Sequence, residues 1–277
     1  MTGLKVLSNS FNKIIALTEF GSNYVLAFFV LFCLYIFKRA KVQSKLVKSL
    51  AFTLITFMSI IMFWAISKAV SNDIPIMYIN PITVIFDSIV EIINIKSPKI
   101  SSFIGLPYVL GFQFLGSLAG FITFVLIFYL FKKVPSNYFE ENEKYTLKDI
   151  LFSNHNEKTL AFSLKEIMFI LIMTITISLT SRNSITYGFN HFTLVLANMI
   201  LLFTILLISS YFNFFTFHIF LGTGFTILNL ITSKNKKEKI KIITHYFIDF
   251  SATILIPAII ALLTILIIKG GKQKYAY

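Results

Sequence analysis

Six apolar runs, each long enough to cross a lipid bilayer, constrain this chain more than any other feature of its sequence. A transmembrane α-helix needs about 20 consecutive, mostly apolar residues. Lipid cannot hydrogen-bond to an open backbone, so segments of this kind span as helices. The sequence therefore predicts an all-α integral membrane protein. The six runs extend over residues 19–37, 50–66, 106–131, 164–179, 192–209 and 246–268.

The composition supports a membrane location. Of the 277 residues, 56% are hydrophobic and only 13% are charged, whereas a soluble domain has about 45–50% apolar and about 25% charged residues. The net charge of +13 comes largely from lysines between the apolar runs, as in Lys38–Lys41 and Lys236–Lys239, which fits contact with anionic lipid headgroups. The sequence contains no basic stripe with interleaved aromatic residues, so it does not indicate nucleic-acid binding. We expect one domain over residues 1–277, multi-pass in the cell membrane, with the lipid bilayer as its main partner.

Two further apolar stretches, residues 74–95 and 213–231, are too short or too interrupted to span. They follow the second and the fifth run, and so occupy corresponding places. Such paired segments indicate a midplane site in an inverted-repeat protein. In the first stretch, Asn80 is a preferred helix N-cap and Pro81 suits the first helical position. We therefore expect a short helix to begin there inside the membrane, although an ordinary loop turn is the alternative.

Two acidic residues lie at matching places, near the starts of the first and fourth runs. Carboxylates inside a membrane are energetically costly and are usually paired or functional. Glu19 and Glu166 therefore favour a division into two repeats, residues 14–131 and 164–269, joined by a polar connection over residues 132–163. The alternative is that both side chains lie at the membrane interface and are solvated.

The sequence contains none of the common patterns of an enzyme. It lacks a phosphate-binding glycine loop and a serine nucleophile elbow. Its four histidines are far apart and do not show the spacing of metal ligands. We expect no catalytic residues, no metal and no other cofactor.

Four segments resemble the major intrinsic protein family, the aquaporins and glycerol facilitators. The segments are the start of the first run, the Asn-Pro box, the third run and the start of the fourth, namely Thr18–Ser22, Ile79–Val84, Leu106–Gly116 and Ala161–Ile167. The resemblance implies an aquaporin-like bundle of six transmembrane helices plus two re-entrant half-helices, arranged as an inverted repeat. It also implies a homotetramer that passes small uncharged solutes, such as glycerol, other polyols or water, down a gradient.

The resemblance also implies roles for individual residues. Asn80 and Asn213 become the pore asparagines, with Ile82 in the first box. Glu19 and Glu166 hold the backbones of the pore loops, Gln113 supports the same region, and Pro81 starts the first half-helix.

The second half departs from the family pattern. Residues 213–216 fall where the second Asn-Pro-Ala-Arg box is expected, but Phe214 and Phe215 replace Pro and Ala, and Thr216 takes the place of the selectivity arginine. Losing that arginine removes a fixed charge and a donor from the constriction. The sequence therefore does not determine which solute passes. A pore that is blocked by the two phenylalanines is an alternative.

The distribution of basic residues supports a different alternative. With the N-terminus in the cytoplasm, as the family implies, only nine of the 25 Lys and Arg residues fall on inner segments. The positive-inside rule favours the opposite distribution. This observation favours a membrane subunit or a secondary transporter of another family.

Overall fold

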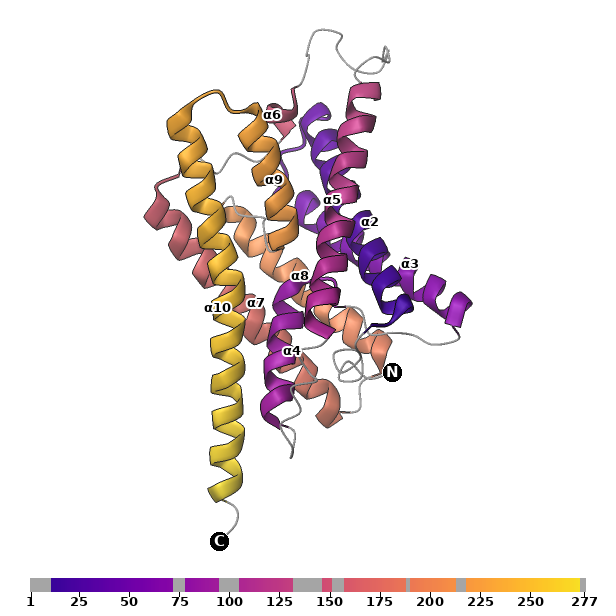
Figure 1. Cartoon of the computed structure of the whole chain (residues 1–277), viewed down its shortest axis with the longest axis vertical. Coiled ribbons are helices and arrows are strands. Elements are labelled where there is room, and N and C mark those ends of the chain that lie inside the picture. Colours follow the sequence, from indigo (N-terminus) through magenta and orange to yellow (C-terminus); the bar gives the residue numbers. More distant parts are fainter. Residues whose placement is uncertain are drawn as a thin grey trace.

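The computed structural model describes residues 11–71, 78–94, 105–131, 146–150, 157–187, 190–212 and 218–274. All regular structure in these residues is α-helical (Figure 1). The helices are α2 (Lys13–Arg39), α3 (Lys45–Ser71), α4 (Pro81–Asn94), α5 (Gly105–Phe131), α6 (Leu147–Ile150), α7 (Thr159–Tyr187), α8 (His191–Tyr211), α9 (Ile219–Thr232) and α10 (Lys236–Lys274).

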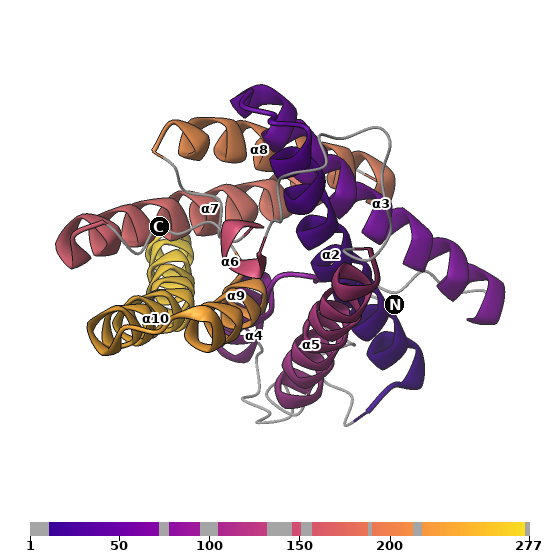
Figure 2. The ribbon, with the colours of Figure 1, turned by 90° about the horizontal axis from the view of Figure 1, so that it is seen from above.

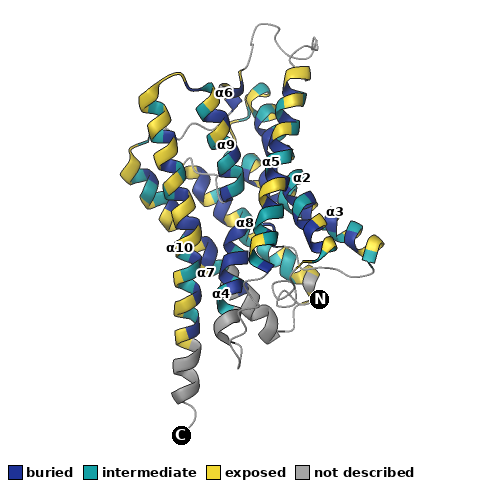
Figure 3. Ribbon diagram, viewed as in Figure 1, coloured by how far each residue is buried: buried dark blue, intermediate teal, exposed yellow. Residues whose placement is uncertain are grey.

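Six of these helices, α2, α3, α5, α7, α8 and α10, are long and apolar enough to cross a membrane. Exposed residues cover much of their outward surface (Figure 3). Many of these residues have large apolar side chains, such as Leu126, which is 61% exposed, and Ile200, which is 67% exposed. Such a surface is compatible with lipid rather than with water. The chain is therefore an α-helical, multi-pass membrane protein, and the prediction of six spanning helices is confirmed.

Helices α4 and α9 are different because each has only 14 residues. At about 1.5 Å per residue they are about 21 Å long, which is less than the roughly 30 Å hydrocarbon core of a bilayer. Their lengths agree with the prediction that the two interrupted stretches do not span. The predicted helix start at Asn80-Pro81 is also confirmed, since Pro81 is the first residue of α4.

The described helices follow the order long, long, short, long twice, in α2–α5 (the first half) and in α7–α10 (the second half). Within each half the outer long helices pack together, α2 on α5 and α7 on α10. Between the halves, α3 packs on α8, α4 on α10 and α9 on α5. The two short helices lie one above the other along the long axis of the molecule (Figures 1 and 2).

Helices α2 and α5 cross at very short distance because α5 carries glycines four residues apart. A Cβ atom on Gly116 would lie 2.1 Å from the carbonyl oxygen of Phe20, and one on Gly120 would lie 2.5 Å from that of Tyr24. Small residues at this spacing let two helix backbones approach closely in a membrane. The crossing brings Glu19 of α2 next to Gln113 of α5.

Candidate functional site

The turn that leads into α4 is held by a carboxylate from another helix. The side chain of Glu19 is fully buried and accepts three hydrogen bonds. Its Oε1 lies 2.7 Å from the backbone N of Tyr78, and its Oε2 lies 3.2 Å from that of Ile79 and 2.9 Å from Nε2 of Gln113. A buried carboxylate needs such partners, because it has lost its contact with water. The geometry matches the bracing that the resemblance implied for Glu19 and Gln113, whose functional role stays a prediction.

Asn80 caps α4 with its own side chain. Its Oδ1 accepts a hydrogen bond from the backbone N–H of Ile82 at 2.9 Å. The amide nitrogen Nδ2 of Asn80 is a hydrogen-bond donor, and it lies 4.0 Å from Sδ of Met173 on α7. The side chain of Ile82 is 1% exposed and lies in the main hydrophobic cluster.

Between Tyr78 and Asn80, the backbone of Ile79 adopts a left-handed conformation with φ 56°. The N–H of Asn80 donates to the carbonyl of Tyr78 two residues earlier, which is the pattern of a γ-turn. A positive φ is unusual for a β-branched residue and costs about 1–3 kcal/mol, so it persists only where the surroundings impose it. Here Glu19 holds the N–H of Ile79, and His218 contacts its carbonyl oxygen.

His218 is the N-cap residue of α9 and joins the two short helices. Its Nε2 lies 2.6 Å from the carbonyl oxygen of Ile79, and its side chain is only 6% exposed. A carbonyl oxygen can only accept, so Nε2 carries the hydrogen and donates it. The N-terminal ends of α4 and α9, which belong to different halves, therefore meet inside the protein.

The sequence does not predict this position for His218. The second box is expected at residues 213–216, and α9 begins at Ile219, with His218 as its N-cap five residues after Asn213. Asn213, Phe215 and Thr216 themselves lie outside the described residues. Histidine is not a preferred N-cap, so local propensity carried no signal for this helix start.

Glu166 of α7 has a different environment from Glu19. It is 1% exposed and lies beside Asp249 of α10, which also accepts a hydrogen bond from Oγ1 of Thr253 at 3.3 Å. The loop that Glu166 was expected to hold falls outside the described residues. Asp249 is not among the site residues predicted from the sequence. It is a single acidic residue inside the last apolar run, and this position is the signal that could have identified it.

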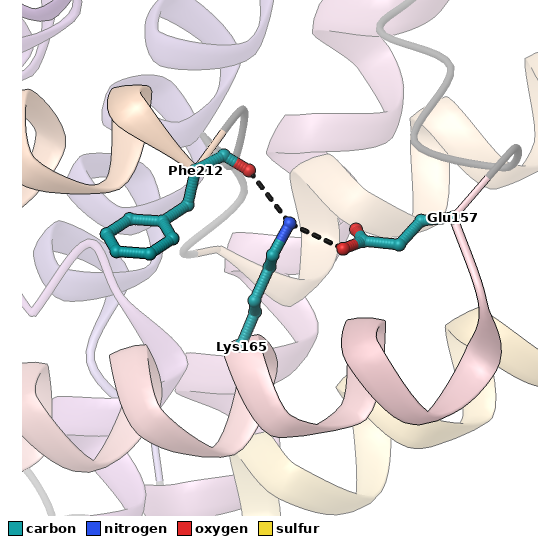
Figure 4. Close-up of polar contacts among 3 residues, drawn as sticks. All are labelled: Glu157, Lys165 and Phe212. Carbon is teal, nitrogen blue, oxygen red and sulfur yellow. Dashed lines mark hydrogen bonds and ion pairs between the residues drawn. The ribbon is translucent and has the colours of Figure 1, made fainter.

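Lys165 fixes the end of α8, where the chain leaves for α9 (Figure 4). Its Nζ donates to the carbonyl oxygen of Phe212, the C-cap of α8, at 3.0 Å, and pairs with Oε1 of Glu157 at 2.5 Å. A cation near a helix C-terminus interacts favourably with the carbonyl groups there. The contact ties the end of α8 to Lys165 of α7, which is the residue before Glu166.

These features define an α-helical multi-pass membrane protein in which the ends of two short helices meet among buried polar side chains. Within the described residues, no group of His, Cys, Asp or Glu is arranged to hold a metal ion. Comparison of the chain with family models, with curated proteins and with solved structures found no match.

Proposed function

We propose that the chain is an aquaporin-like channel for the passive passage of small uncharged solutes, glycerol and other polyols or water. In this proposal α4 and α9 are re-entrant half-helices, and the two halves are an inverted repeat. The repeated order long, long, short, long supports it, and so does the crosswise packing of each short helix on the last long helix of the other half.

The observation that carries the proposal is the contact between the starts of α4 and α9, made by His218 and Ile79. A helix N-terminus presents unpaired N–H groups and a partial positive charge. Two such ends directed at one point repel cations, while a neutral solute that accepts hydrogen bonds can pass. Asn80 adds its amide donor at the same point, and we assign Asn213, Phe215 and Thr216 to the same path.

The partners in this proposal are the lipid bilayer and the neutral solute. The protein is proposed as a homotetramer in the cell membrane, with one pore in each protomer. The apolar exposed faces of the six long helices leave ample surface for lipid and for neighbouring protomers.

Solute flux into proteoliposomes tests the proposal. Purified protein is reconstituted, and the rates of water and glycerol entry are measured by stopped-flow light scattering against protein-free liposomes. We expect both permeabilities, or that of glycerol alone, to exceed the protein-free values. Folded protein that raises neither permeability contradicts the channel.

Asn80→Asp is the matched variant for this test. The new carboxylate keeps an oxygen for the cap on Ile82 but removes the Nδ2 donor and adds a negative charge. We expect α4 to remain folded and the flux of neutral solutes to fall. Equal flux through the variant and the natural protein shows that Asn80 does not line the path of the solute.

A second candidate function is an aquaporin-like protein with a closed pore and a structural role. It is favoured by tight packing where the starts of α4 and α9 meet. Ile79, Ile82 and His218 are 5%, 1% and 6% exposed. This candidate predicts no flux through the natural chain. It also predicts that the double variant Phe214→Pro, Phe215→Ala conducts, because the second box then regains the small residues of the family pattern.

A further inference from the structure

Two buried acidic side chains lie next to each other where α7 packs on α10. Glu166 of α7 is 1% exposed and Asp249 of α10 is 7% exposed, and their carboxyl groups are close enough to interact directly. Both residues belong to membrane-spanning helices. A carboxylate is costly in such a place, and two adjacent carboxylates also repel each other. The pair therefore requires a positive partner.

The helices around the pair offer few charged or titratable groups. On α7, Lys165 pairs with Glu157. On α10, His245 lies one turn before Asp249, and its ring stacks on that of Phe162 of α7 with centroids 4.1 Å apart. The helices packed against α7 and α10, namely α4, α8 and α9, contribute only Asp87, Glu91, His191 and Tyr211. A cationic His245 is therefore the alternative to a proton held by the pair itself.

The oxygens of Glu166 indicate where a proton belongs. Both are buried, and neither has a hydrogen-bond partner among the described residues. Oδ1 of Asp249, in contrast, accepts from Oγ1 of Thr253 at 3.3 Å. An ionised carboxyl group can only accept, whereas a protonated one has an O–H donor. One hydrogen on Glu166 therefore supplies a bond to Asp249 and removes one of the two adjacent negative charges.

We propose that Glu166 and Asp249 form a proton-binding site, in which Glu166 carries the proton and donates it in a hydrogen bond to Asp249. A metal ion fits less well, because hard divalent cations take about six or more oxygen ligands. No group of three or more His, Cys, Asp or Glu side chains is arranged to hold one in the part of the chain that the structure describes. The proton joins α7 to α10, and α10 also packs on α4. The site thus links pH to the support of the first short helix, whether or not the protein conducts a solute.

Infrared spectroscopy of the full chain in lipid vesicles detects this proton. A protonated carboxyl group has a C=O stretching band that a carboxylate lacks. The measurement is the difference between two spectra, in which the bands of other buried acids cancel. We expect the natural protein at neutral pH to show the band and Glu166→Gln, which keeps an N–H donor toward Asp249, to lack it.

Glu157→Gln is the matched control for the infrared measurement. It removes a carboxylate at the same end of α7, but this one pairs with Lys165, so we expect the band to remain. A band of equal strength in the natural protein and in Glu166→Gln overturns the inference. A natural protein without the band also overturns it and leaves His245 as the carrier of the positive charge.

Thermal unfolding at different pH values tests what the proton does. Raising the pH removes it and leaves two negative charges side by side. The folded protein binds a proton that the unfolded chain releases, so its stability decreases as the pH rises. We expect the unfolding temperature of the natural protein and of Glu157→Gln to fall from weakly acidic to alkaline pH, and that of Glu166→Gln to fall less. Equal pH dependence in the natural protein and Glu166→Gln overturns the inference.

Two further measurements keep the test decisive. If Glu166→Gln does not fold, Asp249→Asn takes its place. A neutral amide oxygen accepts more weakly than a carboxylate, so the band of Glu166 is expected to shift or disappear, and an unchanged band overturns the inference. The second measurement is the unfolding temperature at constant pH with increasing sodium concentration. A rise, in a natural protein that lacks the band, overturns the proton site in favour of a cation between two carboxylates.

Discussion

Nε2 of His218 lies 2.6 Å from the carbonyl oxygen of Ile79, although the two residues are 139 positions apart in the chain. This hydrogen bond joins the start of α9 to the turn before α4. Glu19 accepts a hydrogen bond from the N–H of the same Ile79. The two halves of the protein thus clamp one residue whose φ of 56° local sequence does not favour.

Removing the donor at His218 is expected to destabilise the protein. His218→Phe leaves the buried carbonyl of Ile79 without its bond, which costs about 1–3 kcal/mol. Thermal unfolding in detergent or lipid measures the loss. His218→Gln is the control, because it keeps a donor at the same reach, and we expect it to unfold close to the natural protein. Equal unfolding temperatures for the Phe variant and the natural protein contradict a stabilising contact.

Glu19→Gln is expected to loosen the turn before α4. The carboxylate accepts from Tyr78, Ile79 and Gln113, whereas an amide has one accepting oxygen and directs its own N–H groups at the remaining donors. At least one buried N–H loses its partner, and we expect a loss of about 1–3 kcal/mol.

The exchange variant Glu19→Gln, Gln113→Glu provides the control for Glu19. It keeps one carboxylate and one amide between α2 and α5, so their mutual hydrogen bond is retained. We expect it to recover part of the stability that the single variant loses. A single variant as stable as the natural protein excludes the bracing role.

The close crossing of α2 and α5 predicts opposite effects at two glycines of α5. A methyl group on Gly116 meets the backbone oxygen of Phe20 at 2.1 Å, whereas one on Gly111 has nothing within 4 Å. We expect Gly116→Ala to cost about 1–3 kcal/mol through overpacking. Gly111→Ala is expected to be neutral or to stabilise the helix by roughly 0.5–1 kcal/mol. Unfolding in detergent compares the two variants, and equal effects contradict the close approach.

The two short helices differ in how far the sequence predicts them, for a physical reason. The start of α4 follows from local chemistry, because Asn80 and Pro81 suit the N-cap and the first helical position. The start of α9 depends on a hydrogen bond from His218 to a carbonyl in the other half. No window of sequence contains such a contact. The proximity of Glu166 to Asp249 cannot be predicted from the sequence for the same reason, since the two residues lie on different helices, α7 and α10.

The six long helices were predictable because the bilayer sets their length independently of any partner. The first and last residues of these helices were less predictable. The last apolar run covers residues 246–268, whereas α10 extends over Lys236–Lys274. The flanking lysines are good helix formers that are not apolar, so a hydropathy criterion ends before the helix does.

The orientation of the protein in the membrane is the remaining expectation, and one labelling experiment tests it. The proposed channel has its N-terminus in the cytoplasm, which puts the connection between α2 and α3 outside. The positive-inside rule prefers that connection, which contains Lys38 and Lys41, on the inside. Ser44 is exposed in this connection. A Ser44→Cys variant in a Cys33→Ala background carries a single thiol, since Cys33 is the one cysteine of the chain.

We expect a membrane-impermeant maleimide to label Ser44→Cys on intact cells. Phe11→Cys in the same background is the opposite reference, because α2 separates the two positions and Phe11 is 53% exposed. The channel orientation predicts that this reference is labelled only after the membrane is permeabilised. The reverse pattern places the basic connection in the cytoplasm, contradicts the channel topology and favours a transporter or membrane subunit that uses these lysines to dock a cytoplasmic partner.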